Sequence, residues 1–350
     1  MTAKLPRTKC ILTLTTTLLA ACATETVMQP TPPPVDWRSF DARAPSVDTH
    51  KISATEKERA VVDVYTKALV SPNTADLAAT LDEDAHFTFA GEKNAHGPDA
   101  IVKAHEVLFG GFEHRNFVAG RVWHTDRSHV FEWSMTGVHT RDWMGVAPTQ
   151  KPVTIGGLTL LWTKDDASIT DVHVYFDEAA VKAQLGAGPK SLVSVPPSQA
   201  STVALPQARQ AFDQTGSPNE SANAKLVRSS LDALENSDET GYLAMMADDV
   251  EVTTLESADP ARGKMSQRAY FKAMHKAIGQ LDVTVENLWG IGKFVIVEYF
   301  IVGEQQGPLG WVPLQRNGVL KLFVVDVVEI RDGKIARISR YDNPAQVMAK

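Results

Sequence analysis

Cysteine is scarce in this sequence, and the basic residues do not cluster. The two cysteines, Cys10 and Cys22, both lie near the N-terminus, so none beyond residue 22 is left for a disulfide or a reactive thiol. The 35 Lys and Arg residues are outnumbered by 42 Asp and Glu residues, and they form no basic run. Because nucleic acid is bound through a basic surface, we do not expect it as a partner.

The sequence also lacks the spacings that hold a metal ion. Eight of the ten histidines lie between residues 86 and 173, and imidazole is the commonest metal ligand. However, there is no H-E-x-x-H or H-x-H pattern and no cysteine partner. We therefore interpret these histidines as surface or core residues, and we expect neither a metal nor a cofactor.

The N-terminal apolar run is too short to cross a bilayer, which takes roughly 20 residues as a helix. Lys4, Arg7 and Lys9 precede this run, and Leu-Ala-Ala-Cys at 19–22 closes it, which is the pattern of a signal segment. The ending resembles a bacterial lipobox, which implies cleavage before Cys22 and lipidation of its thiol. An ordinary secretory signal that is cleaved nearby is the alternative.

Residues 23–50 are predicted to form a tether after the leader, residues 1–22. Pro30 and the run 32–34 favour an extended segment over a packed element. Ala23, rather than Asp, follows the cysteine, and the resemblance to Gram-negative lipoproteins then favours the outer membrane. We expect an exported protein that is anchored to the membrane by lipid and faces the periplasm.

The body of the chain contains an internal repeat. The segment SITDVHVYF at 168–176 has a strand-like counterpart, KIARISRYD, at 334–342. Residues 166 positions apart continue to match upstream, for example Trp123 with Trp289. A match over about a hundred positions indicates that a whole domain is duplicated.

Each copy begins with helical spacing and ends with strands. Ser53 and Glu56 have the spacing of a capping box, and apolar residues recur at helical intervals from Ala60 to Leu69. Alternating, strand-like segments follow, and helices before a run of antiparallel strands predict an α+β fold. We divide the body into a first domain, a linker rich in Pro, Ser and Gly, and a second domain: 51–185, 186–221 and 222–350.

A motif in the repeat resembles the SnoaL-like polyketide cyclase and ester cyclase group of the nuclear transport factor 2-like superfamily. The first copy carries the motif at Gly137, His139, Gly145, Pro148, Thr149, Lys151 and Val153, and the second at Asp332, Gly333, Lys334 and Ile335. Gln150 stands where the family has glycine. The resemblance implies that each domain is a curved antiparallel sheet wrapped around N-terminal helices, a cone whose open end is a small-molecule cavity.

The resemblance also suggests catalytic residues. Enzymes of this superfamily, such as ketosteroid isomerase, move protons with carboxylate, Tyr and His side chains held in the cone. Glu132 and His139 are the candidate acid/base pair on this ground. The position that carries an acid in related cyclases holds Val174 and Arg340, and Glu132 also fits an outward charge paired across strands.

Four further residues are candidates for ligand binding: His86, Trp143, Tyr175 and Asp177. Strand alternation puts His173, Tyr175 and Asp177 on one face and apolar residues on the other, and the apolar face better fits the interior. Trp143 follows Asp142 in a loop at the expected mouth of the cone, where it would lie over a ligand. Simple packing or a dimer contact is the alternative for this tryptophan.

Two functions fit these observations. In the first, the protein is a binding or scaffold module that holds a small apolar molecule, mainly in the first domain. In the second, it is an isomerase-, dehydratase- or cyclase-type enzyme that acts on a carbonyl compound there. Units of this fold commonly bury the outer sheet face against a partner, so we expect the two domains to form a pseudo-dimer within one chain.

Overall fold

The computed structural model describes residues 56–71, 73–189, 208–257, 259–310, 312–314 and 318–348. All of them belong to one compact unit, Ala42–Lys350. The predicted leader, the tether and Cys22 lie outside the described residues. Of the helices that are described, none is both long enough and apolar enough to span a membrane.

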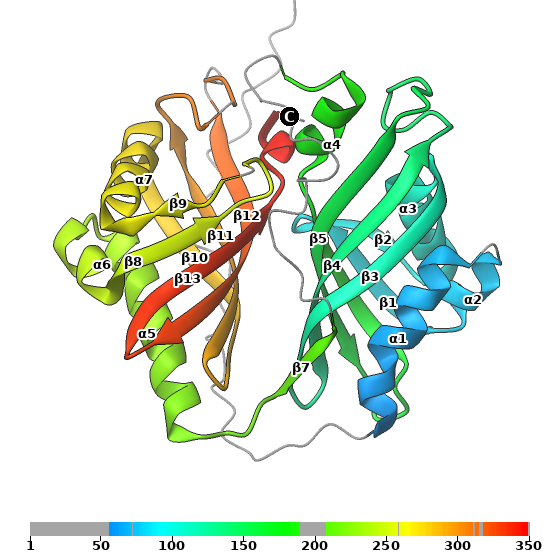
Figure 1. Cartoon of the computed structure of the whole chain (residues 1–350), viewed down its shortest axis with the longest axis horizontal. Coiled ribbons are helices and arrows are strands. Elements are labelled where there is room, and N and C mark those ends of the chain that lie inside the picture. The colour runs from blue at the N-terminus through cyan, green and yellow to red at the C-terminus, as the bar shows by residue number, and fades with distance from the viewer. Residues whose placement is uncertain are drawn as a thin grey trace, which may run out of the picture. The chain divides into compact units, whose positions relative to one another are not determined.

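The first domain is a seven-stranded sheet with α1, α2 and α3 on one face (Figure 1). The strand order is β2-β1-β6-β5-β4-β3-β7. The elements are α1 (Glu56–Val70), α2 (Thr74–Ala78), β1 (Leu81–Phe89), β2 (Glu92–His96), α3 (Pro98–Phe109), β3 (Phe112–His124), β4 (Ser128–His139), β5 (Pro152–Thr163), β6 (Ile169–Tyr175), α4 (Glu178–Leu185) and β7 (Gln210–Asp213).

The second domain repeats this plan with a six-stranded sheet in the order β10-β11-β12-β13-β8-β9. Helices α5, α6 and α7 lie on one face of that sheet (Figure 1). The elements are α5 (Pro218–Glu235), α6 (Glu239–Met245), β8 (Met246–Thr253), β9 (Ala261–Arg262), α7 (Gly263–Ala277), β10 (Ile278–Ile291), β11 (Phe294–Gln305), β12 (Val319–Arg331), β13 (Lys334–Asp342) and the 3-10 helix η2 (Pro344–Met348).

The α+β fold with two tandem cones is confirmed, but the sheets are mixed rather than purely antiparallel. Strand β1 pairs parallel with β6, and β8 pairs parallel with β13. The first strand of each domain thus lies beside the last one, and the intervening strands form an antiparallel meander. Residue alternation predicts which face of a strand is buried, but it does not predict the neighbouring strand, so the sequence could not reveal this pairing.

Retained glycines start the helix that covers each sheet. Gly97 precedes α3 with φ of 78°, and Gly263 is the first residue of α7 with φ of 74°. Residues with a Cβ rarely adopt this left-handed region, which explains why both copies have glycine here. The two helices then bury corresponding faces, namely Ile101, His105, Leu108 and Phe109 in α3 and Gln267, Phe271, Met274 and Ala277 in α7.

Part of the segment assigned to the linker, 186–221, is structured. Strand β7 adds to the first sheet by pairing parallel with β3, and the Phe212 ring stacks on Trp123 with centroids 5.9 Å apart. Helix α5 begins at Pro218 with a complete capping box between Ser217 and Glu220. Strand β7 therefore closes one edge of the first sheet.

Candidate functional site

Glu132 on β4 is fully buried, and its side chain points toward the second domain. It accepts hydrogen bonds from Arg121 Nη2, 2.9 Å away, and from the hydroxyl of Tyr341 on β13, 2.8 Å away. Burial raises the pKa of the Glu132 carboxyl, and the Arg121 charge and the hydrogen bonds offset part of that rise. Its contacts place this carboxylate between the two sheets.

Tyr175 makes the reciprocal contact. Its hydroxyl donates to Glu298 on β11 at 2.7 Å, and His173 Nδ1 lies 2.7 Å from the same oxygen. Glu298 also accepts from Asn287 at 2.6 Å. Glu298 and Tyr341 lie 166 positions after Glu132 and Tyr175, so each domain supplies one carboxylate and one tyrosine.

His139 lies at the end of β4 with its ring packed on Phe112. Its Nδ1 accepts from the backbone N–H of Thr149 at 3.2 Å, and its Nε2 is buried without a hydrogen-bond partner. Burial lowers the pKa of this imidazole. His139 lies seven residues after Glu132 on β4, and the two side chains have different hydrogen-bond partners, so the structure does not bring them together as an acid/base pair.

The candidate ligand-binding residues of the first domain lie apart from one another. Trp143 is 1% exposed, and its indole N–H donates to the Leu108 carbonyl at 2.8 Å, so it packs in the core rather than over a mouth. His86 stacks on His96 with centroids 4.6 Å apart. Asp177 caps α4 by accepting from the backbone N–H groups of its second and third residues.

The interior of the first cone is filled by aromatic side chains. Trp133 packs edge-on against Phe109 and Phe176, with centroids 5.9 and 6.2 Å away, and Phe89 packs on Phe176 at 4.7 Å. Phe87 is also buried and packs on His105, with ring centroids 4.8 Å apart. Large side chains of this kind each bury ~150–250 Å², and together they leave little room in the cone.

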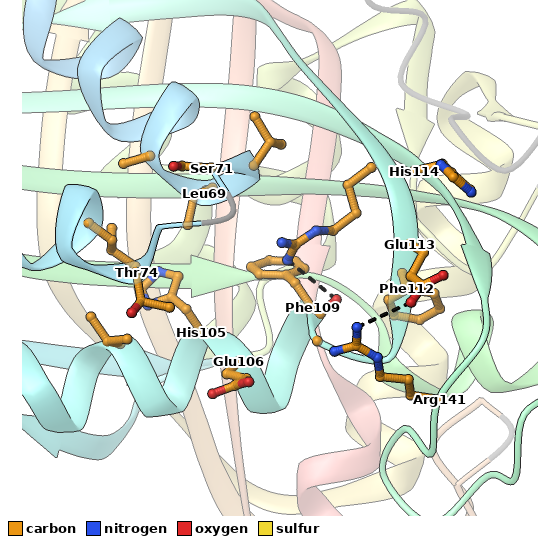
Figure 2. Close-up of a pocket in the computed structure, with 16 residues that line it drawn as sticks. Leu69, Ser71, Thr74, His105, Glu106, Phe109, Phe112, Glu113, His114 and Arg141 are labelled. Carbon is orange, nitrogen blue, oxygen red and sulfur yellow. Dashed lines mark hydrogen bonds and ion pairs between the residues drawn. The ribbon is translucent and has the colours of Figure 1, made fainter.

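A cleft of about 570 Å³ lies at the helical side of the first domain. Figure 2 shows Leu69 and Thr74 facing His105 and Glu106 of α3 across it. His105 is a satisfied core residue, since its Nδ1 donates to the Ile101 carbonyl and its Nε2 lies 2.5 Å from the Tyr65 hydroxyl. Burial lowers the pKa of His105 to about 4, so it is neutral at physiological pH.

The second cone keeps an internal hollow of about 390 Å³, which we call the second-domain hollow. Its wall is mostly apolar, with a few charged and polar groups converging on it, which is the usual make-up of a small-molecule site. The lining includes Val252, Thr254, Glu256, Tyr270, Met274, Leu309, Leu322, Val324, Arg340 and Asp342.

This hollow exists because the aromatic residues of the first domain are replaced in the second. The strand pairings show that Val252, Thr254, Tyr299 and Asp342 occupy the positions of Phe87, Phe89, Trp133 and Phe176. Each replacement is smaller or more polar than its counterpart. Duplication has therefore produced one filled cone and one open cone.

A buried ion pair forms the floor of the second-domain hollow. Arg340 on β13 donates from Nε and Nη2 to the two carboxylate oxygens of Asp326 on β12, at 2.9 and 2.8 Å. The Tyr299 hydroxyl donates to Asp326 at 2.9 Å, and the guanidinium lies 4.7 Å from the centre of the Tyr270 ring. The two-pronged pairing satisfies a charge that burial would otherwise make costly.

Two carboxyl groups at this hollow titrate near neutrality. Burial raises the pKa of Asp342 to about 6, with the Asp326 charge adding to the rise and Arg340 opposing it. Burial and the charges of Asp342 and Asp177 raise the pKa of Glu256 to about 8. Groups with such pKa values can both accept and donate protons at physiological pH.

Sequence reasoning missed this set of residues because it weighted the histidine-rich first copy. When the two copies are aligned, these residues can be recognised as polar residues at inward positions where the other copy has an apolar residue. Arg340 opposite Val174 and Asp342 opposite Phe176 are such pairs. In the part of the chain that the structure describes, no group of three or more His, Cys, Asp or Glu side chains is placed to hold a metal ion.

Comparison with known proteins identifies both halves. Residues 59–185 match the family described as SnoaL-like polyketide cyclase, and residues 227–338 match the family described as SnoaL-like domain. No curated protein matches the chain.

Three solved structures illustrate the likeness of a single domain. A candidate SnoaL-like polyketide cyclase from Jannaschia sp. CCS1 is 21% identical over 38% of this chain and 92% of its own, with a TM-score of 0.35. An LEH-like epoxide hydrolase from M. tuberculosis is 21% identical over 37% and 90%, with a TM-score of 0.31. A cystatin-fold protein from Novosphingobium aromaticivorans is 18% identical over 34% and 96%, with a TM-score of 0.29.

Both family matches fall on the two sheets with their covering helices, which share one strand plan and one set of corresponding positions. The chain therefore consists of two tandem SnoaL-like domains of the nuclear transport factor 2-like superfamily.

Proposed function

We propose that the protein binds a small, largely apolar molecule in the second-domain hollow, while the first domain serves as a packed scaffold. The observation that carries this proposal is the replacement of the first cone's aromatic filling by Val252, Thr254 and Asp342. The volume of about 390 Å³ lies within the ~300–1,000 Å³ range of small-molecule sites. The sequence pattern favours a site in the first domain, but aromatic side chains occupy the interior of that domain.

The test fills the hollow with a side chain that the fold already accepts elsewhere. Val252→Phe copies Phe87 of the first domain, which is 1% exposed at the corresponding position. We expect 2-naphthol, a neutral apolar probe, to bind the purified full chain in calorimetry and this variant to lose the binding. Val319→Phe, at an exposed position of the same domain, is the matched control. Equal binding by both variants would refute the site.

An acid/base enzyme in the same hollow is the second candidate. The observation that favours it is the pair Asp342 and Glu256, whose pKa values of about 6 and about 8 suit proton transfer. The Asp342 carboxylate would take a proton from the carbon beside a carbonyl, and protonated Glu256 would donate one to the carbonyl oxygen. The test is exchange of the α-protons of 2-tetralone in D2O followed by NMR. Loss of accelerated exchange in Asp342→Asn with retained 2-naphthol binding supports catalysis, and no acceleration by the native chain rejects it.

We also propose that the chain is exported and carried on the membrane by lipid at Cys22. The leader pattern and the lipobox resemblance support this proposal. Cys22→Ala should move the protein from the membrane fraction to the soluble periplasmic fraction and abolish labelling by a fatty acid. A variant that stays on the membrane would contradict the lipid anchor.

A further inference from the structure

Acidic groups outnumber basic ones at the second-domain hollow. Glu256, Asp259 and Asp342 line it, with Asp326 directly behind, and Arg340 is the only cation among the described lining residues. Most of the wall between these groups is hydrocarbon. A site with an apolar body and excess negative charge discriminates between ligands by their charge.

Arg340 compensates only part of this excess of negative charge, because it is already paired with Asp326. Two of its nitrogens bind the two oxygens of Asp326, and its guanidinium lies over the Tyr270 ring. Since the Arg340–Asp326 pair is neutral as a unit, Arg340 offsets only part of the charge of Asp342, and the pKa values of Asp342 and Glu256 both stay raised.

Asp177 of the first domain adds a third carboxylate to the excess of acidic groups at this hollow. Asp177 is 2% exposed, and its Oδ2 has no hydrogen-bond partner. Burial and the charge of Asp342 raise the pKa of Asp177 to about 7, and Asp177 in turn raises that of Glu256. Like charges that raise one another's pKa are the groups that a ligand cation would stabilise in their ionised form.

We propose that the molecule bound in the second-domain hollow is an organic cation, an amine with a small apolar body. Its ammonium group would lie between Asp342 and Glu256, and its hydrocarbon part would pack on Val252, Leu322 and Val324. This inference rests on the proposed binding function and names the ligand class for that site.

Binding of such an amine is expected to depend on pH. The charged groups that line the hollow are Asp342, Glu256, Asp259 and Arg340. Asp326, which is paired with Arg340, and Asp177, whose charge acts on Glu256, lie next to these lining groups. The amine stays protonated below about pH 10, whereas the raised pKa values of Asp342, Asp177 and Glu256, about 6, about 7 and about 8, mean that these three carboxyl groups lose protons over the range from pH 6 to 8. Affinity should therefore increase from pH 5.5 to pH 8.

The experiment compares three probes of one shape by calorimetry on the full chain: cyclohexylmethylamine, cyclohexylmethanol and cyclohexanecarboxylate. We expect the amine to bind at least tenfold more tightly than the alcohol at pH 8, and the carboxylate to bind less tightly than either. Glu256→Gln, and Glu256→Gln with Asp342→Asn, should remove the preference for the amine and keep the alcohol. Asp332→Asn, in an exposed turn with φ of 53° that suits Asn, is the matched control and should change nothing.

The possible results of this experiment distinguish the cation proposal from the more general proposal that the hollow binds a small molecule. Equal binding of amine and alcohol, or tighter binding of the carboxylate, overturns the cation proposal and leaves the binding function in place. Failure of all three probes and of 2-naphthol overturns both. A preference for the amine that survives in the Glu256 variants also overturns the assignment, because the charge would then be recognised elsewhere.

Discussion

Residues at matching positions of the two domains fill the same buried space with different polar interactions. In the first domain, the Trp133 indole N–H donates to the Thr159 hydroxyl at 2.9 Å, beside Val174 on the next strand. In the second domain, Tyr299 replaces Trp133, Asp326 replaces Thr159, and Arg340 replaces Val174. The first solution uses one neutral hydrogen bond, and the second uses a buried ion pair that needs both partners.

This difference predicts a non-additive pair of substitutions. Arg340→Val leaves the Asp326 charge buried without its cation, and removing one partner of a buried pair costs about 3–5 kcal/mol of unfolding free energy. Adding Asp326→Thr restores the arrangement of the first domain and should recover most of that loss. Urea unfolding of the two variants measures the effect. Losses that simply add would show that the pair is not coupled.

The interior arginine illustrates what the sequence could and could not predict at this scale. Comparison of the two copies locates Arg340 opposite Val174, so its unusual position was visible. Its partner Asp326 was not visible, because the pairing depends on which residues of β12 and β13 face each other. Likewise, Glu132 and Glu298 occupy matching positions of the two copies, but their hydrogen bonds to tyrosines of the other domain are contacts that no spacing within one copy reveals.

Neighbouring strands supply a different cation to each of these glutamates. Glu132 has Arg121 from β3 of its own sheet, whereas the matching position on β10 holds Asn287. Glu298 instead receives His173 from β6 of the first domain. Burial alone would lower the pKa of His173, but the charge and hydrogen bond of Glu298, with Glu286 and Asp171, outweigh burial and raise it.

The contact between His173 and Glu298 is expected to depend on pH. Because the folded pKa of His173 is raised, its contribution is complete below the unfolded value of about 6.5 and is lost as pH rises through the folded value. His173→Gln should therefore cost stability most between about pH 5 and 6.5, and the gap to the native chain should narrow above pH 8. Thermal unfolding from pH 5 to 9 measures it. The control is His86→Gln, because the His86 ring stacks on His96 and does not contact Glu298. A stability difference between His173→Gln and the native chain that widens as pH rises would contradict the role given to His173.

The order of the helices and long strands was predictable, but the short strand β7 and the parallel strand pairings were not. Helical spacing of apolar residues and strand alternation locate most of the helices and the long strands, because these signals are local. Ser53 of the predicted capping box lies outside the described residues. Strand β7 has only the four residues Gln210–Asp213 and lies in a segment rich in Pro, Ser and Gly, so it had no periodic signal. The parallel pairing of β1 with β6 joins residues about ninety positions apart, and only the closed sheet determines it.

At the scale of the whole molecule, the outer faces of the two sheets supply each other's polar partners. Glu132 and Glu298 are both fully buried, and each is bonded to a tyrosine of the other domain. Aromatic side chains accompany them, with Trp162 and Trp289 centroids 6.1 Å apart and Trp123 and Phe294 centroids 5.4 Å apart. These contacts support the proposal that the chain forms a pseudo-dimer of its own two domains.

A pseudo-dimer leaves neither sheet face free for a second chain, which predicts the oligomeric state. The chain that begins at residue 23, without the leader and Cys22, should be a monomer by light scattering at micromolar concentration. The double variant Tyr175→Phe with Tyr341→Phe removes one donor from each buried glutamate, and each loss should cost about 1–3 kcal/mol. If the two faces cover each other, this variant should unfold at lower urea concentration and remain monomeric before it unfolds. A stable dimer of the native chain would mean instead that another surface of the molecule associates, and the internal pairing of the domains would not account for the assembly.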